Sequence, residues 1–443
     1  MGKEISLYNS FSDLLNAQKK DNSAIMYDRD GKMNYLSYTE LIQKIDEYPA
    51  SQGSSVGILC ENNLETILAI FAYAKRKKQI VLLNPLENIS ILKEQIEASD
   101  VDYLVGEKEL VDSLNPFLVH RNVAENGNIL FFTSGTTSSS KAVILTESSL
   151  CASAYNGGSL LALKEEDTLL SILPLNHVFG FVCSLLWGLS FGAKVALGRG
   201  RRHLVDDLSY FKTTVISLVP QLADFFSSSN IFNKELRLVL IGAGCCQKGT
   251  IDSIKGKGIQ VAYGYGLTET SSGVALSIGE DPDLMKICPL VDIKVASDGE
   301  ILLKSDKCLL KGYYKDSDKT KSSFAGSYFK TGDLGKIKDG YLRLSGRKKD
   351  ILVLSSGNKI FCEEYESKLR RYLKNIDFAI NLNNSKLTLY VYSEKKEIDI
   401  AEKVNEFNKS EPLERRIARI VYRKEKIPKT FNGKIQRWKL SED

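Results

Sequence analysis

The chain of 443 residues has few of the side chains that build metal centres or disulfide frameworks. It contains three histidines, and its eight cysteines include no Cys-x-x-Cys pair and no histidine at metal-ligand spacing. Because zinc sites usually combine cysteine and histidine at short, regular spacings, no zinc site is expected. The cysteine pattern instead predicts a reduced chain, which is typical of the cytoplasm.

Long apolar segments are missing as well. A membrane-spanning helix needs about 18 or more consecutive apolar residues, and no run in this sequence approaches that length. The amino-terminal stretch MGKEISLYNSFSDLL has no apolar segment after its early lysine, so it does not resemble a signal peptide. We therefore expect a soluble cytoplasmic protein without stable membrane association.

Neither sign of charge dominates the chain. Its 60 basic and 55 acidic residues give a net charge of +5, which is small for this length and does not indicate a nucleic-acid partner. A hydrophobic content of 43% and a charged content of 26% are ordinary for globular proteins. The length allows about two or three domains, each large enough to bury a core.

What the sequence does contain is an alternation of short apolar runs and amphipathic stretches. Residues 55–60, 79–83 and 103–105 have the pattern of strands, and residues 63–75 and 90–98 that of the intervening helices. Such alternation predicts α/β units with a largely parallel sheet.

The alternation of strand and helix patterns ends at about residue 281. Short strands separated by turns, among them residues 309–313 and 341–345, indicate a small β-module. Residues 351–443 follow with strands of their own after the charged segment Gly346-Arg-Lys-Lys-Asp. We expect an α/β fold with layered sheets and the β-module in an N-terminal domain over residues 1–346, and a small α+β C-terminal domain.

A hydroxyl-rich tract interrupts two apolar runs at residues 133–140. Seven of its eight residues carry hydroxyls, the eighth is Gly135, and Lys141 follows. Backbone N–H groups, hydroxyls and one lysine suit a polyphosphate. The P-loop signature is absent, because no glycine precedes Lys141 and Ala142 follows it. The tract alone fits either a flexible Gly/Ser linker or an anion-binding loop.

Three further segments combine glycine with polar side chains. Tyr263-Gly-Tyr-Gly-Leu-Thr-Glu-Thr follows a predicted strand, and its threonine and glutamate offer oxygen atoms to phosphate and Mg²⁺. In Thr331-Gly-Asp333 the aspartate can accept both hydroxyls of a ribose or simply cap a turn. A lysine on a glycine turn, as at Lys434, usually has no special role.

Taken together, the order and spacing of these segments resemble the adenylate-forming superfamily of acyl- and aryl-CoA synthetases, peptide-synthetase adenylation domains and luciferases. The match covers nearly the whole chain. It consists of the Thr/Ser/Gly tract, Tyr-Gly-x-x-Thr-Glu, Thr-Gly-Asp, Gly-Arg-x-x-Asp and the terminal Pro-Lys-Thr-x-x-Gly-Lys.

The resemblance implies a role for each motif residue in two steps, formation of acyl-AMP from ATP and transfer of the acyl group to a thiol. The loop residues expected to hold the β- and γ-phosphates are Thr133, Ser134, Gly135, Thr136, Thr137 and Lys141. The adenosine is expected to contact Gly264, Tyr265, Gly266, Asp333 and Arg347, with Tyr265 stacked on adenine and Asp333 on the ribose. Thr268 would contact phosphate, Glu269 would hold Mg²⁺, and Lys434 would bridge the carboxylate and the α-phosphate.

In this superfamily the C-terminal domain, here residues 351–443, rotates between the two steps. The hinge is expected over residues 347–350 at Lys349, and the segment Gly357-Asn-Lys359 would replace Lys434 in the second step.

The segment Pro174-Leu-Asn-His177-Val-Phe-Gly180 is similar to one that acyl- and aryl-CoA ligases place near the substrate carboxylate. His177 is therefore a candidate site residue, although it could also cap a helix or lie in the core. Phe179 and Phe181 would form apolar walls. No aspartate occurs between residues 168 and 205 to pair with an α-ammonium, and a buried unpaired ammonium is costly. An acyl or aryl acid is thus favoured over an amino acid.

The expected acceptor is coenzyme A or the phosphopantetheine of an acyl carrier protein. Two alternatives remain, a stand-alone amino-acid adenylating enzyme and a non-catalytic nucleotide-binding relative. The non-catalytic alternative is suggested by the loop sequence, in which Ser138, Ser140 and Ala142 stand where the family has two glycines and a proline.

Overall fold

The structure, a computed structural model, describes residues 5–51, 53–119, 121, 123, 126–133, 141–244, 246–279, 281–354, 359–374, 376–384, 386–392, 398–429 and 435–440. Contacts divide the chain into two units. The first comprises residues 1–293 and 303–329, and the second comprises residues 294–302 and 330–443. The hinge expected at residues 347–350 stays a prediction, since this division falls at a different point of the chain.

The first unit contains two sheets. The smaller sheet runs in the order β17 (Gly312–Tyr313), β7 (Lys141–Thr146), β6 (Asn128–Thr133), β4 (Gln79–Leu83), β3 (Ser55–Leu59) and β5 (Tyr103–Val105). Strands β6, β4, β3 and β5 are parallel, whereas β7 and β17 are antiparallel to their neighbours. Parallel strands buried on both faces account for the continuous apolar runs of the sequence.

The larger sheet of this unit follows the order β14 (Met285–Ile287), β13 (Ser272–Ser277), β12 (Gln260–Leu267), β11 (Leu238–Ile241), β10 (Val215–Leu218), β8 (Thr168–Ser171), β9 (Lys194–Leu197), β1 (Ser23–Arg29) and β2 (Lys32–Ser37). From β12 to β1 the strands are parallel, and β13, β14 and β2 are antiparallel additions at the two ends. The carboxyl ends of the parallel strands are where α/β proteins usually bind ligands.

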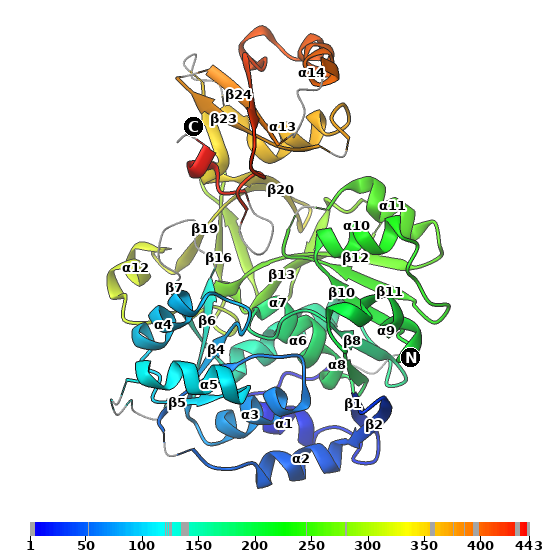
Figure 1. Ribbon diagram of the computed structural model, residues 1–443, viewed down its shortest axis with the longest axis vertical. Coiled ribbons are helices and arrows are strands. Elements are labelled where there is room, and N and C mark those ends of the chain that lie inside the picture. Colours follow the sequence, from blue (N-terminus) through cyan, green and yellow to red (C-terminus); the bar gives the residue numbers. More distant parts are fainter. Residues whose placement is uncertain are drawn as a thin grey trace. The chain divides into compact units, whose positions relative to one another are not determined.

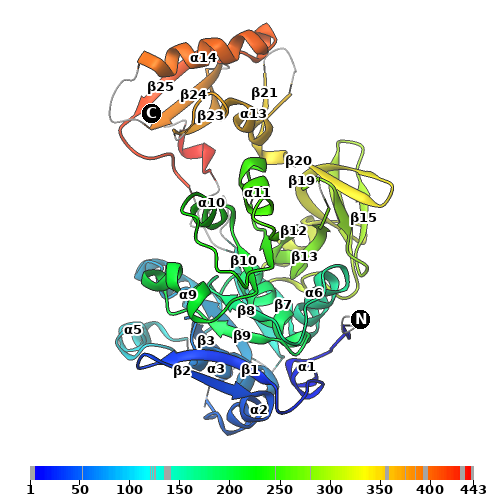
Figure 2. The same ribbon diagram turned by 90° about the vertical axis from the view of Figure 1, so that its right-hand side faces the viewer.

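Helices fill the space between these sheets and cover their outer faces (Figures 1 and 2). The inner helices include α1 (Phe11–Asn16), α3 (Leu64–Lys75), α6 (Glu147–Leu160), α7 (Val178–Phe181) and α8 (Trp187–Ser190). The outer layers are α4 (Ile89–Ala98) and α5 (Lys108–Leu114) on the smaller sheet and α9 (Leu204–Tyr210), α10 (Pro220–Ser228) and α11 (Lys248–Lys255) on the larger one.

Helix α3 shows how the sequence sets this arrangement. Asn63 caps its amino terminus by accepting a hydrogen bond from the backbone N–H of Thr66, which satisfies one of the free donors of the first turn. The body of the helix is apolar on all sides and buried from Thr66 to Ala74. A helix that is apolar all round must be covered on every side, and the layer between two sheets provides that cover.

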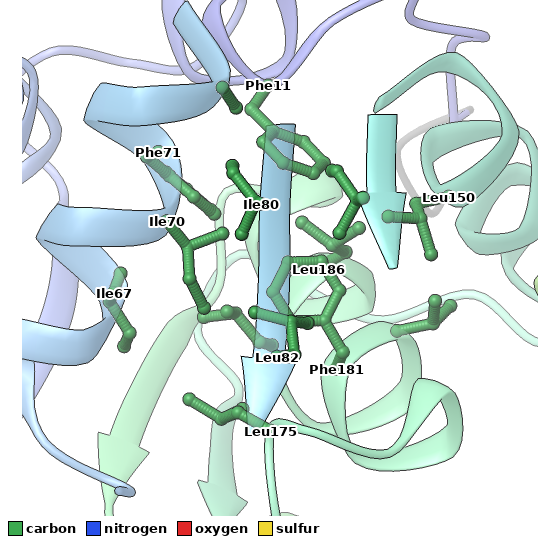
Figure 3. Packing of buried hydrophobic residues seen from close by; sticks show 14 of the residues in the cluster. Phe11, Ile67, Ile70, Phe71, Ile80, Leu82, Leu150, Leu175, Phe181 and Leu186 are labelled. Atoms are coloured by element: carbon green, nitrogen blue, oxygen red, sulfur yellow. The ribbon is translucent and has the colours of Figure 1, made fainter. Parts of the chain in front are cut away.

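Phenylalanine rings lie among isoleucine and leucine side chains in the core of this layer (Figure 3). The rings of Phe11 and Phe71 are stacked with centroids 4.9 Å apart. The ring of Phe181 lies 5.7 Å from Phe11 and 5.9 Å from Phe131, so it joins α7 to α1 and to β6. Phe181 is fully buried. It is a core residue, and its expected place in an apolar pocket wall is wrong.

The second unit contains the β-module and the C-terminal residues. The module includes β16 (Glu300–Lys304), β19 (Tyr328–Lys338) and β20 (Tyr341–Arg347). The C-terminal part contains β21 (Ile351–Val353), β22 (Lys359–Phe361), α13 (Cys362–Leu369), β23 (Asp377–Asn383), β24 (Lys386–Tyr392), α14 (Ile398–Ser410) and β25 (Arg419–Arg423). Helices α13 and α14 pack with β23 and β24 around a separate apolar core, as expected for an α+β domain.

The segment 309–313 departs from the expected arrangement. Its short strand β17 pairs with β7 in the smaller sheet of the first unit, with Gly312 opposite Ile144 and Tyr313 opposite Val143. It does not belong to the β-module. The antiparallel edge of β7 needs a partner for its backbone groups, and β17 supplies it.

In the described part of the chain, no helix combines the length and the apolar character that membrane crossing requires. The cysteines in this part, seven of the eight, are free.

We predict that Phe71→Ala destabilises the first unit by about 3–5 kcal/mol, because truncating a buried phenylalanine leaves a cavity. The comparison variant is Phe225→Ala, since Phe225 is 42% exposed on α10 and its truncation should cost far less. Urea unfolding followed by circular dichroism measures both changes. Equal shifts of the two midpoints would contradict the assignment of Phe71 to the core.

Candidate active site

The hydroxyl-rich tract connects two neighbouring strands of one sheet. Thr133 ends β6, Lys141 begins β7, and the two residues are direct partners in the antiparallel ladder. This pairing excludes the alternative of a linker between domains. Thr133 and Lys141 are both half-buried at this end of the sheet. The expected phosphate-binding residues Ser134, Gly135, Thr136 and Thr137 lie outside the described residues.

The first residues of the Tyr-Gly-x-x-Thr-Glu motif continue the strand that precedes it. Strand β12 continues through Gly264, Tyr265 and Gly266 to Leu267, and pairs with β13 through an irregularity between Tyr265 and Gly266. A Cβ atom at Gly266 would lie 1.5 Å from the carbonyl oxygen of Ser272. This glycine is therefore required by the protein's own backbone. A Cβ atom at Gly264 would make only ordinary van der Waals contacts. The side chain of Tyr265, between the two glycines, is 9% exposed.

Thr268 and Glu269 lie in the tight turn that joins β12 to β13. The turn is a single 3₁₀ turn over Thr268–Thr270, closed by a hydrogen bond from the backbone N–H of Leu267 to the Thr270 hydroxyl. Ser271, directly after it, adopts a left-handed conformation with φ of 54°, and such strained residues concentrate at functional sites. The turn fixes both side chains at the carboxyl end of β12.

Two hydrogen bonds from a distant part of the chain hold Glu269. Its backbone carbonyl accepts from the N–H of Leu310 at 2.8 Å, and its Oε1 accepts from the hydroxyl of Tyr313 at 2.9 Å. Burial and the nearby Glu269 carboxylate raise the pKa of Tyr313, so its hydroxyl stays a proton donor. No sequence pattern indicates this contact, because the partner of a two-residue strand is set by tertiary structure.

His177 follows β8 and occupies the amino-terminal cap position of α7. Its side chain makes no capping hydrogen bond in the described structure. The spacing Pro-x-x-His-x-x-Gly has a steric basis here, because a Cβ atom at Gly180 would lie 2.3 Å from the carbonyl oxygen of Pro174. Burial lowers the pKa of His177. At neutral pH the imidazole is therefore uncharged.

Phe179 is half-buried and lies against the backbone of Gly242 at the end of β11, where an added Cβ atom would come within 2.8 Å of the ring. The ring and His177 thus lie at the carboxyl ends of β8 and β11. The place of Phe179 in an apolar pocket wall stays a prediction.

Asp333 and Arg347, in the second unit, are brought together as direct partners in the ladder between β19 and β20. The Nε of Arg347 lies 2.9 Å from Oδ1 of Asp333, and Asp333 is buried. A buried carboxylate requires such a partner. The sequence placed the two residues in one site, and the register of the hairpin makes them neighbours.

Lys434 lies outside the described residues, as does most of the Gly357-Asn-Lys359 segment. The residues that flank Lys434 are well fixed. Lys429 and Ile435 form an antiparallel bridge, and the backbone N–H of Gln436 donates to the carbonyl of Pro428 at 2.8 Å. Arg437 follows with a two-pronged ion pair to Glu366, at 2.6 and 2.8 Å, which anchors this segment on α13.

Comparison with known proteins adds independent information. The model of the AMP-binding enzyme family matches residues 119–314. The 2-succinylbenzoate–CoA ligase of Listeria monocytogenes serotype 4b is 27% identical over 418 residues, with 87% of this chain and 88% of the relative covered. That of Oceanobacillus iheyensis is 28% identical, covering 79% and 81%.

Solved structures give the same fold. The O-succinylbenzoate coenzyme A synthetase of Bacillus subtilis in complex with AMP has a TM-score of 0.83 at 21% identity, covering 98% of both chains. The anthranilate CoA ligase AuaEII in complex with anthranoyl-AMP also reaches 0.83, at 20% identity and covering 98% of this chain and 97% of the other. The predicted fold class is confirmed. The predicted resemblance and enzyme class are confirmed with it, since residues 119–314 match the AMP-binding enzyme family and the relatives are named as CoA ligases.

Proposed function

We propose that this chain uses ATP and Mg²⁺ to activate an acyl or aryl acid as acyl-AMP, and then transfers the acyl group to coenzyme A. The observation that carries the proposal is the fixed carboxylate of Glu269 at the end of β12, held through both its backbone and its side chain. The names of the matched relatives, all CoA ligases, support coenzyme A as the acceptor over a carrier-protein phosphopantetheine.

A single carboxylate suits the expected metal. Among the described residues, no three His, Cys, Asp or Glu side chains gather in a way that could hold a metal ion. Mg²⁺ does not need such a cluster, because it is usually bound by one or two carboxylates together with substrate phosphates and water. Glu269 would hold the ion, which when bound supplies positive charge to the polyphosphate.

The first step joins two anions and therefore needs cations and donors around the reacting atoms. A carboxylate oxygen of the acid forms a bond to the α-phosphorus, and the bond to the bridging oxygen breaks as pyrophosphate leaves with the electron pair. Lys434 would offset the charge of both anions. Thr133, Lys141 and the loop between them would hold the departing phosphates, and Thr268 would donate to phosphate.

The second step attaches the acyl carbon to the thiol sulfur, and AMP leaves. Tyr265 would stack on its adenine, and Asp333, with Arg347 beside it, would bind the ribose. We propose that residues 351–443 rotate about Lys349 between the steps. Lys349 is exposed, whereas its neighbour Lys348 is ion-paired to Asp298 and Glu300 at 2.7 and 2.8 Å. An exposed residue next to an ion-paired one suits a hinge.

The acid is best sought among compounds without an α-ammonium, since no aspartate lies between residues 168 and 205. His177 would donate a hydrogen bond to the acid carboxylate, and Phe179 would contact its apolar part. The names of the relatives make 2-succinylbenzoate the first acid to test.

ATP–pyrophosphate exchange without thiol, across aryl, fatty, hydroxy and amino acids, tests the function directly. We expect exchange with aryl or acyl acids and none with amino acids, because nothing in this segment pairs with an ammonium. Exchange with amino acids alone would contradict the proposal in favour of an amino-acid adenylating enzyme. ATP binding without exchange for any acid would contradict it in favour of a non-catalytic relative.

We predict that Lys434→Ala lowers the rate of adenylation by about 10²–10³-fold, the usual loss for a donor that acts where charge develops. Thioester formation from supplied acyl-AMP should persist, because that step does not use Lys434. Lys426→Ala, which removes an exposed lysine, is the matched control. Equal loss of both half-reactions would rule out the proposed alternation.

A pH prediction follows from the lowered pKa of His177. The folded state favours the neutral imidazole. Its contribution to the free energy of unfolding is therefore fully present above the ordinary histidine pKa of about 6.5. It is lost as the pH falls from there toward the folded pKa, since the unfolded chain then binds the extra proton. We expect His177→Gln to lose less thermal stability than the wild type between pH 7.5 and 5.5. His203→Gln, at an exposed position, should behave as the wild type; parallel curves for all three would contradict the burial of His177.

A further inference from the structure

The contact between Tyr313 and Glu269 joins two segments that are 44 residues apart in sequence. Tyr313 is 8% exposed and belongs to the core of the first unit. A phenylalanine would fill the same volume, so packing alone does not explain the hydroxyl. The hydroxyl is explained by its hydrogen-bond partner Glu269, the carboxylate proposed to hold Mg²⁺.

The backbone around Tyr313 leaves the ring little freedom. The N–H groups of Lys311 and Tyr314 donate to the carbonyls of Ile144 and Ala142 on β7, at 3.0 and 2.9 Å. The N–H of Tyr313 itself donates to the hydroxyl of Thr320 at 2.9 Å. The backbone that carries the ring is thus held both by strand β7 and by α12 (Ser317–Ser322).

The same segment also fixes the backbone of Glu269, through the bond from Leu310. Glu269 is therefore held at two points by a segment that is itself paired with β7. Strand β7 begins at Lys141, the lysine proposed to contact the polyphosphate. Lys141 lies on β7 and Glu269 is hydrogen-bonded to a segment paired with β7. The strand would therefore keep the distance between the lysine and the carboxylate constant.

We propose that Tyr313 is a positioning residue that orients the Glu269 carboxylate for Mg²⁺·ATP. This inference rests on the proposed function, because it assumes that Glu269 holds the metal. A hydrogen bond to one carboxylate oxygen fixes the rotation of the whole group, and thereby the direction in which its second oxygen points. Partners of this kind behind a metal ligand typically contribute about 10–100-fold to metal affinity.

Tyr314, the residue directly after β17, provides a matched control. Its hydroxyl donates to Oδ2 of Asp100 at 3.0 Å, away from Glu269. Tyr313→Phe and Tyr314→Phe therefore remove the same atom from neighbouring residues, each with one carboxylate partner. Tyr314 is half-buried, so differences between the two variants are read together with the identity of the carboxylate that each hydroxyl contacts.

The test measures the binding of Mn²⁺·ATP to the full chain by electron paramagnetic resonance, without acid or thiol, and the Mg²⁺ dependence of pyrophosphate exchange. We expect Tyr313→Phe to weaken Mn²⁺·ATP binding about 10-fold and to raise the half-saturating Mg²⁺ concentration by a similar factor, with the KM for the acid unchanged. Tyr314→Phe should alter neither quantity. Equal behaviour of the two variants would overturn the proposal.

Glu269 variants separate this inference from the proposed function. Glu269→Asp shortens the side chain by one methylene and breaks the contact with Tyr313. It should therefore weaken Mn²⁺·ATP binding without any change at Tyr313. This variant replaces Tyr313→Phe in the test if Tyr313→Phe does not fold. In the Glu269→Asp background, Tyr313→Phe should add less than a twofold effect. A full additional effect would overturn the positioning role. Unchanged metal binding in Glu269→Gln would instead overturn the metal role of Glu269 in the proposed function.

Discussion

The pairing of β17 with β7 is the constraint on which the candidate site of the first unit depends. Strand β7 continues from the hydroxyl-rich tract, and β17 carries Tyr313. The segment that contains this two-residue strand reaches the turn with Glu269 through Leu310 and Tyr313. Without the segment, the turn after β12 would lose these two hydrogen bonds. A short edge strand thus connects the smaller sheet to the end of the larger one.

This connection matters because the proposed chemistry brings anions together. The phosphates, the acid and Glu269 all carry negative charge, and their approach is favourable only if cations and donors are held in place beforehand. The layered core supplies that rigidity. Phe181 joins α7, which begins after His177, to α1 and β6, so the residues proposed to contact the acid and the phosphates project from one packed layer.

Much of the fold could be predicted from the sequence, because buried parallel strands and amphipathic helices have distinct patterns. Strand β4 was expected at residues 79–83 and is found there, and the helix expected at residues 63–75 begins at Leu64 after its Asn63 cap. Short elements were harder. The segment 309–313 was assigned to the β-module, although β17 lies in the smaller sheet, because two residues do not specify a partner.

The site shows the same division between local and tertiary information. Asp333 and Arg347 were expected together, and the hairpin register places them opposite each other. Gly266 was attributed to a ligand but is required by the carbonyl of Ser272. Phe181 was expected in a pocket and lies in the core, since the direction of a side chain on a short helix depends on packing. The contact from Tyr313 depends entirely on tertiary pairing.

The central claim is that the acid is activated by direct bonding of its carboxylate to the α-phosphorus of ATP. Its most direct test uses an acid that supports pyrophosphate exchange, labelled with ¹⁸O in the carboxyl group, in a complete reaction with coenzyme A. Mass spectrometry of the products then follows the label. Transfer of one ¹⁸O atom into AMP is the predicted result, because the bridging oxygen stays with phosphorus when the thiol attacks. Label in inorganic phosphate, with ADP as the nucleotide product, would contradict the account.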